Sequence, residues 1–414
     1  MPPKKQRAEN NKPALRARLF GPMLVLLLVL PIVSWMVASK VKERTDDARF
    51  VSYGKPGPWG NMEYVRIAIE LPDHYIDVEN LDPNDWFFKG QSKKEALGIL
   101  KQCGLTETQL RAVEASEWEN VPAGSRVFLS DDLVWNLKGD SRAKLYSFLG
   151  QHEENVDQYN AFVYRPDRVE ERLAYSGLNS VSISMFKQLL YPQESLLRFA
   201  DVDIVLRKIN DREERMRFVK TVSRRSSLLV KLSVTPETDV EGLLNYWGGG
   251  GRAKDLRPLL ESLARVPGGC KIDIAHLLPP FVRQRLYTYP LPDSEAHFGR
   301  QDCHWTSLNF WNDNAGRGFD SPEAAASAVE AGYFHVADAL EDAQLGDIIF
   351  LQSQDGNLIH SAVFIADDVV FTKNGSGPNQ PWIYMKMEDM LPFYDSPNET
   401  PRLLIYRRKS VELQ

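Results

Sequence analysis

The residues best suited to chemistry lie in the last third of the chain, where Cys303 follows Asp302 in the stretch RQDCHWTSLNFWND. Trp305, Leu308 and Trp311 recur at three-residue spacing, which predicts a helix with a buried stripe that begins at or near Cys303. The positive end of a helix dipole and its unpaired N–H groups favour the thiolate, which is the nucleophilic form of cysteine. Cys303 is therefore the candidate nucleophile, although a buried, unreactive cysteine is the common alternative.

A nucleophilic cysteine needs a base, and His360 has the most suitable surroundings. His304 is adjacent to the cysteine, but successive helical residues do not face each other. His360 opens HSAVFIA, the middle one of three predicted strands, between DIIFLQ and DVVFTKN. Asn374 ends the third strand and could orient the imidazole, as a third residue does in cysteine–histidine sites.

This order of features resembles the papain-like peptidoglycan hydrolases of the NlpC and CHAP type, over roughly residues 280–400. The residues that carry the resemblance are Asp302–Cys303 opening a helix, Gly346–Asp347 before an apolar run, His360 leading an apolar strand, and Asn374 after the next strand. The resemblance implies Cys303 as nucleophile, His360 as general base and Asn374 as the orienting residue.

Tyr289 is a weaker match to a family tyrosine that helps to bind the oxyanion. The chain departs from the pattern in two places: the Gly-Gly that usually follows this tyrosine is missing, and His304–Trp305 replaces a small Ser-Gly pair. These differences affect the expected shape of the substrate site and the role of Tyr289 more than they affect the nucleophile.

The resemblance implies acyl transfer without a cofactor. The Cys303 thiolate would attack an amide carbonyl, and water would then hydrolyse the thioester with the histidine as base. A cell-wall peptide, or a protein, is the expected substrate. A metal site is not expected, because no pair of His or Cys has zinc-ligand spacing.

The N-terminus predicts a membrane segment. Residues 19–39 are uncharged and about as long as the ~20 residues that cross a bilayer as a helix. More Lys and Arg precede this segment than follow it, which places the N-terminus in the cytoplasm and the bulk of the chain outside, in the periplasm. The expected location is therefore the cytoplasmic (inner) membrane with a single pass; a cleaved signal peptide is the alternative.

The expected fold class is α+β, with an N-terminal transmembrane helix, a mixed but mainly helical middle module, and a C-terminal papain-like domain in which a helix packs on an antiparallel sheet. The expected divisions are a basic tail at 1–18, the transmembrane helix at 19–39, a linker at 40–61, the middle module at 62–265, the papain-like domain at 266–408 and a tail at 409–414.

A formal net charge of -6 gives no indication of nucleic-acid binding. Of the three cysteines, Cys103 and Cys270 could pair in an oxidising compartment and leave Cys303 as the odd thiol. Two other function classes stay open: a non-catalytic envelope binding or scaffold protein, and a papain-like acyltransferase or transglutaminase. The sequence leaves the oligomeric state and the role of residues 62–265 open.

Overall fold

The computed structural model describes residues 51–292, 294, 299–394 and 400–409. The chain divides into two compact units, Met1–Tyr53 and Gly54–Gln414. Strand β1 (Val51–Tyr53) is the described part of the first unit. The membrane segment predicted at 19–39 lies outside the described residues, and within the described ranges no helix is both long and apolar enough to cross a membrane.

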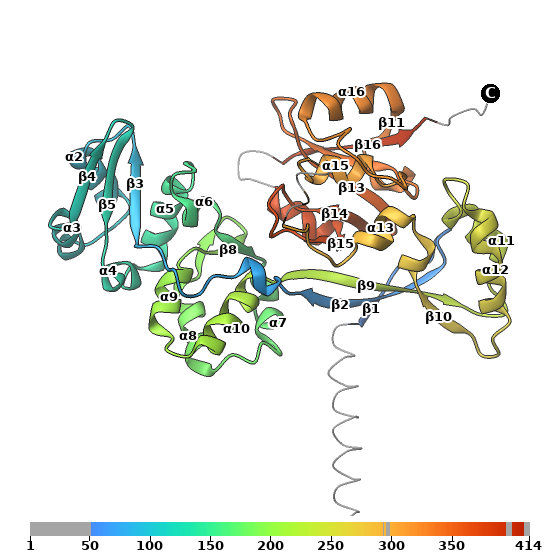
Figure 1. The fold of residues 1–414 in the computed structure, drawn as a ribbon, viewed down its shortest axis with the longest axis horizontal. Coiled ribbons are helices and arrows are strands. Elements are labelled where there is room, and N and C mark those ends of the chain that lie inside the picture. The colour runs from blue at the N-terminus through green and yellow to red at the C-terminus, as the bar shows by residue number, and fades with distance from the viewer. Residues whose placement is uncertain (1–50, 293, 295–298, 395–399, 410–414) are drawn as a thin grey trace, which may run out of the picture. The chain divides into compact units, whose positions relative to one another are not determined.

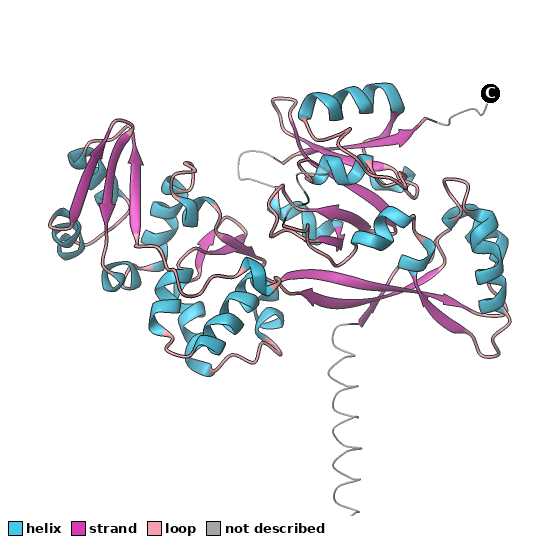
Figure 2. Ribbon diagram, in the orientation of Figure 1, coloured by secondary structure: helices cyan, strands magenta, loops and turns pink. Residues whose placement is uncertain are grey.

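The second unit contains two long antiparallel strands, β2 (Asn61–Ile69) and β9 (Arg225–Val234), which form the extended ribbon in Figure 2. Leu228, Val230 and Leu232 alternate along β9 and are buried, as expected for a strand covered on one face. The further elements beside β9 are α11 (Val240–Trp247), α12 (Ala253–Ala264) and β10 (Cys270–Asp273), which pairs with β9.

Between β2 and β9 the chain forms two three-stranded antiparallel sheets, ordered β3-β5-β4 and β6-β8-β7, together with short helices. The elements of this region are β3 (Asp85–Lys89), α2 (Lys93–Gln102), α3 (Glu107–Glu114), β4 (Glu117–Val121), β5 (Gly124–Phe128), α4 (Asp131–Trp135), α5 (Gly139–Leu149), α6 (Val156–Tyr159), β6 (Phe162–Tyr164), α7 (Val169–Leu173), α8 (Ser180–Leu189), β7 (Tyr191–Gln193), β8 (Leu196–Phe199), α9 (Val202–Lys208) and α10 (Arg212–Ser223).

The expected fold class was wrong. The described residues form a mixed α/β structure, and the region expected to be mainly helical contains strands throughout. Residues 194–209 illustrate the cause: their sequence fits a single helix, but β8 (Leu196–Phe199) ends before α9 (Val202–Lys208) begins. A short apolar run fits a helix and a strand equally well, and pairing with β6 and β7 decides in favour of the strand.

The C-terminal region is built on a six-stranded antiparallel sheet of order β11-β16-β12-β13-β14-β15. Helix α15 contacts β13 and β14, and these elements lie together in Figure 1. The bounds are α13 (Pro280–Arg285), α15 (Cys303–Leu308), α16 (Pro322–Gly332), β11 (Tyr333–Ala337), β12 (Ile348–Gln352), β13 (Leu358–Ala366), β14 (Val369–Lys373), β15 (Trp382–Lys386), α17 (Met387–Met390) and β16 (Arg402–Arg408).

The two faces of this sheet pack into different hydrophobic clusters. Val363 and Phe371 belong to the cluster that contains Trp305 of α15. Ala362 and Phe364, which alternate with Val363 along β13, belong to a separate cluster on the other face. Each residue of β13 can therefore be assigned to the α15 face or to the opposite face by its position in the strand.

The start of β12 depends on Gly346 and Asp347. Gly346 has φ +89°, and a Cβ at this position would lie 2.3 Å from the Trp311 side chain. The buried Asp347 carboxylate accepts from Arg407 Nε at 2.9 Å and from Arg407 Nη2 at 2.7 Å. The Gly-Asp pair of the family resemblance thus has a structural role here, because it shapes the strand entry and joins it to β16.

One hydrophobic cluster crosses the boundary that we expected at residue 266. It contains Tyr64 of β2, Val230 of β9 and Trp247 of α11 together with Trp305 of α15 and Phe371 of β14. The long strands and the C-terminal sheet are therefore joined through buried apolar side chains rather than through a linker alone.

Candidate active site

Cys303 is the first residue of α15, as the sequence predicted, and it is only 7% exposed. The helix begins there because the Asp302 carboxylate caps it, accepting a hydrogen bond from Trp305 N–H at 2.9 Å. Trp305 is fully buried, so it belongs to the core. Helix α15 is shorter than expected and ends at Leu308, so Trp311 lies beyond it.

The surroundings of Cys303 favour the neutral thiol. Burial, together with the Asp302 charge, raises the pKa of Cys303 to about 11. The N–H and hydroxyl of Ser361 and the N–H of His304 act in the opposite direction but do not outweigh burial. The helix terminus alone predicted a thiolate; desolvation of a buried charge is the larger effect in this structure.

By its position in β13, His360 belongs to the face of the strand that carries Ala362 and Phe364, whereas Ser361 belongs to the α15 face. It is the third residue of this strand, and the register pairs it with Leu351 of β12, a member of the Ala362–Phe364 cluster. Its ring stacks on Tyr394 with centroids 4.3 Å apart, and its Nε2 lies 3.0 Å from Thr372 Oγ1. Burial, and to a lesser degree His304, lowers the pKa of His360 to about 3, so the imidazole is neutral at pH 7.

Asn374 does not hydrogen-bond to His360. Its Nδ2 donates to Met385 Sδ at 3.0 Å, and its Oδ1 lies 3.5 Å from the Tyr394 hydroxyl. Tyr394 was not recognised in the sequence, yet it connects the expected residues: it stacks on His360, and burial and the charge of Cys303 raise its own pKa. Cys303, His360 and Asn374 therefore share Tyr394 as a neighbour.

Tyr289 lies apart from these residues. Its hydroxyl donates to Ile69 O on β2 at 3.3 Å. Burial raises the pKa of Tyr289 to about 12, and the charged side chains that affect it are Arg225 and Glu70. The structure therefore does not place Tyr289 where it could bind an oxyanion formed at Cys303.

Ser361, rather than His360, faces α15 from β13. The register pairs Ser361 with Phe350, whose cluster contains Leu308 of α15. The Ser361 hydroxyl donates to Ser307 Oγ at 3.1 Å and lies 3.0 Å from His304 Nδ1. Hydrogen bonds therefore connect His304 to the residues around the Cys303 thiol.

The backbone of Leu358 also interacts with the His304 ring. Burial lowers the pKa of His304, while the Asp302 charge and the Leu358 backbone act to raise it. With Nδ1 facing Ser361, the second ring nitrogen is the one available to the Leu358 carbonyl, so a backbone group can orient the ring. The sequence contained one signal for this role, the direct adjacency of His304 to Cys303, which we discounted because adjacent helical residues diverge.

All three cysteines are free thiols in the structure, so it contains no bond between Cys103 and Cys270. Among the described residues, no group of three or more His, Cys, Asp or Glu side chains is arranged to hold a metal ion. Comparison with protein-family models, with curated proteins and with solved structures found no match.

Proposed function

We propose that the C-terminal region is a cysteine hydrolase that cleaves an amide bond, with Cys303 as nucleophile. The observation that carries this proposal is the arrangement at the start of α15: a thiol in the first turn, the Ser361 hydroxyl beside it, and His304 Nδ1 3.0 Å from that hydroxyl. These are a nucleophile, a proton relay and a base, which are the groups that acyl transfer to a thiol requires.

In the proposed first step, the proton leaves Cys303 as its sulfur attacks the amide carbon. With the ring proton of His304 on Nε2, Nδ1 can accept the Ser361 hydroxyl proton while the Ser361 oxygen accepts the thiol proton. The backbone N–H of Cys303 is the nearest candidate donor to the oxyanion. The protonated His304 then gives its proton to the leaving amine, and a thioester remains on Cys303.

In the second step a water molecule attacks the thioester. His304, acting through Ser361, takes the proton from that water, and the carboxylic acid leaves as the Cys303 thiol forms again. The thiol and imidazole are both neutral before the reaction, so proton transfer accompanies attack rather than preceding it. Leu358 and Ile359, 39% and 40% exposed at the start of β13, offer apolar surface next to His304 for a substrate side chain.

We propose a peptidoglycan stem peptide as the substrate class. This part of the proposal rests on the prediction that the chain is exported, because a cell-wall peptide is the abundant amide outside the cytoplasmic membrane. The family resemblance supports the same substrate class, but it implies His360 as base, whereas the register and the hydrogen bonds favour His304.

A non-catalytic envelope-binding protein is the second candidate, and one observation favours it. The pKa of Cys303 is raised to about 11 and that of His360 is lowered to about 3, both chiefly by burial, which is the pattern of a packed core rather than of an activated pair. In that case Cys303 and His360 stabilise the sheet, and another part of the chain binds the envelope.

One experiment separates the two candidates. The full chain and its Cys303→Ala variant are incubated with purified cell wall, and released fragments are analysed by mass spectrometry. A hydrolase releases fragments that Cys303→Ala does not release, and Cys303→Ser serves as the matched variant closest in size. No release by the wild-type chain, or equal release by Cys303→Ala, would refute the hydrolase.

A further inference from the structure

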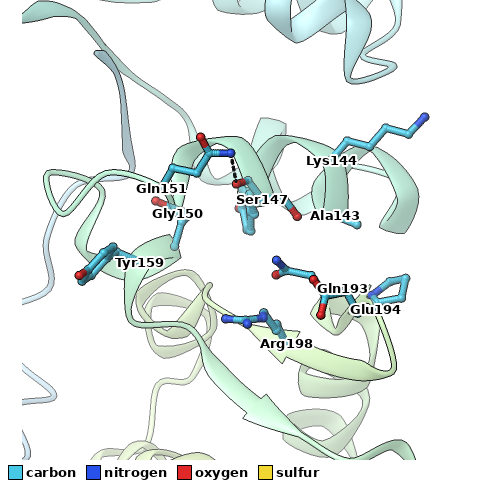
Figure 3. Close-up of a pocket in the computed structure, with 12 residues that line it drawn as sticks. Ala143, Lys144, Ser147, Gly150, Gln151, Tyr159, Gln193, Glu194 and Arg198 are labelled. Atoms are coloured by element: carbon cyan, nitrogen blue, oxygen red, sulfur yellow. Dashed lines mark hydrogen bonds between the residues drawn. The ribbon is translucent and has the colours of Figure 1, made fainter. Parts of the chain in front are cut away.

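A cavity of about 630 Å³ lies far along the chain from Cys303, between α5, α6 and the β7–β8 hairpin. Figure 3 shows its lining, with Tyr159 on one side, Gln193 on the other and Arg198 between them. The volume falls within the roughly 300 to 1,000 Å³ typical of small-molecule sites. This cavity has no part in the function proposed above.

Arg198 supplies a positive charge without a counter-ion. Its Nε is buried without a hydrogen-bond partner. Among the described residues its guanidinium makes neither an ion pair nor a hydrogen bond, whereas the buried Arg142 pairs with Asp201 at 3.0 Å. A guanidinium left open toward a cavity is a binding group for a planar anion such as a carboxylate, which it can hold through two parallel hydrogen bonds.

Gln158 adds a second polar side chain to the lining of the cavity. It is only 8% exposed and lines the same cavity, and its side-chain amide has no hydrogen-bond partner within the described part of the chain. Its amide can therefore hydrogen-bond to a molecule that occupies the cavity. Gln193 on β7 likewise lines the cavity without a side-chain partner among the described residues.

The hairpin that carries Gln193 is held in an uncommon conformation. Glu194 has φ +59°, in the left-handed region that non-glycine residues rarely adopt. Gln193 pairs with Leu196, so Glu194 and Ser195 form the two-residue turn at the edge of the cavity. A positive φ at this position is what a two-residue hairpin turn requires, and the turn fixes Gln193 beside the cavity.

We propose that this cavity binds a short peptide through its free C-terminal carboxylate. Arg198 holds the carboxylate, and the glutamine side chains, each with N–H donors and a carbonyl acceptor, pair with the peptide groups that precede it. Tyr159, 52% exposed at the edge, offers a ring face to a peptide side chain. A phosphate fits less well, because it cannot use the glutamine donors and acceptors together.

Binding is tested by titrating the full-length protein into N-acetyl-trialanine and following the ligand NMR signals, with the all-L and the all-D peptide run separately. The C-terminal amide of each peptide and inorganic phosphate are the comparison ligands. We expect a free-acid peptide to bind and its amide to bind at least about tenfold more weakly, because a charged partner of Arg198 is lost. Arg198→Gln should weaken binding of the free-acid peptide by a similar factor.

Arg212→Gln is the matched control, since it removes an exposed guanidinium from α10 that pairs with Glu79 outside the cavity. Gln193→Leu keeps Arg198 and should still weaken binding of the peptide. This second variant tests the proposal even if Arg198→Gln does not fold. Cys303→Ala should bind as the wild-type chain does, so the outcome is independent of the hydrolase proposal. No binding by either free acid, equal binding by acid and amide, or Arg198-dependent binding of phosphate alone would each overturn the proposal.

Discussion

Ser361 Oγ lies 3.0 Å from His304 Nδ1, and this contact joins the strand β13 to the residue that follows Cys303 in α15. It gives a role as base to His304, which the sequence analysis set aside because it is adjacent to Cys303. Cys303 and His304 need not face each other for a proton to pass between them, because a hydroxyl from the sheet lies beside both. The contact therefore changes which histidine should matter for activity.

Replacing each histidine by glutamine tests this assignment. We expect His304→Gln to lower the rate of fragment release from cell wall by about 10²- to 10⁴-fold, the range for loss of a general base. His360→Gln should retain at least a tenth of the wild-type rate, because His360 lies on the other face of β13. Rates are compared at equal folded concentration. Loss of activity in His360→Gln with activity kept in His304→Gln would restore the assignment that the family resemblance implies.

The single proton of the Ser361 hydroxyl leads to a second prediction. In the structure the hydroxyl donates to Ser307 Oγ, so Ser307 competes with the Cys303 sulfur and with His304 Nδ1 for this one proton. Ser307→Ala removes the competing acceptor and should lower the pKa of Cys303, raising its alkylation rate by iodoacetamide several-fold at pH 8; Ser361→Ala should lower that rate. One hydrogen bond is worth about 1 kcal/mol, or roughly fivefold.

Alkylation has to be read by peptide mass spectrometry, because Cys270 is partly exposed and will also react. In the wild-type chain the rate at Cys303 should rise about tenfold per pH unit up to a pH near its pKa of about 11. A plateau below pH 8 would show that the thiol is already ionised, and it would contradict the dominance of burial.

His360 makes the folded state sensitive to acid. Its pKa is about 3 in the fold against 6.5 for an unburied histidine, so between these values the unfolded chain binds a proton that the folded chain does not. Stability from this residue is fully present above pH 6.5 and is lost as the pH falls. By pH 4.5 the loss should be about 2 to 3 kcal/mol.

Urea unfolding at pH 7 and pH 4.5 measures this loss. The fall in unfolding free energy should be smaller by that amount in His360→Gln, which cannot titrate. His276 is exposed, so the unfolding free energy of His276→Gln should fall between pH 7 and pH 4.5 as much as that of the wild-type chain does. An unchanged pH dependence in His360→Gln would mean that the imidazole is accessible to protons in the folded state.

The ion pair at the start of β12 should dominate the local stability of the sheet. Arg407→Met leaves the Asp347 carboxylate buried and without its guanidinium, and breaking a buried pair in this way costs about 3 kcal/mol. Arg408→Met is the control, since Arg408 is the next residue and is exposed. Thermal unfolding of both variants tests this prediction. Equal stability of Arg407→Met and Arg408→Met would show that water replaces the Arg407 guanidinium without loss of stability.

Much of the local structure was predictable because short-range signals decide it. Ser92 and Glu95 form a capping box at the start of α2, and Asp302 caps α15, so both helix starts could be read from neighbouring residues. The strand around His360 was also predicted. The face of the sheet on which each of its side chains lies could not be predicted. HSAVFIA is buried on both sides and lacks the alternation of apolar and polar residues that distinguishes one face from the other.

The strands between β2 and β9 were missed for a related reason. Their pairing is between short segments, and β3 contains only Asp85–Lys89, rich in aromatic residues but too brief for a periodic pattern. Contacts distant in sequence, such as Ser361 with His304, depend on that pairing and on register. A one-residue shift in the register of β13 would exchange His360 and Ser361 between faces, which no local rule excludes.

The apolar cluster that contains Val230, Trp247, Trp305 and Phe371 gives the molecule a mechanical property. A shift of β2 or β9 would alter the packing around Trp305, in the helix that begins with Cys303, because these side chains share one buried cluster. A fragment starting at residue 266 would expose one side of this cluster and should aggregate instead of folding. The long ribbon and the helix that presents the thiol are therefore anchored in the same hydrophobic core.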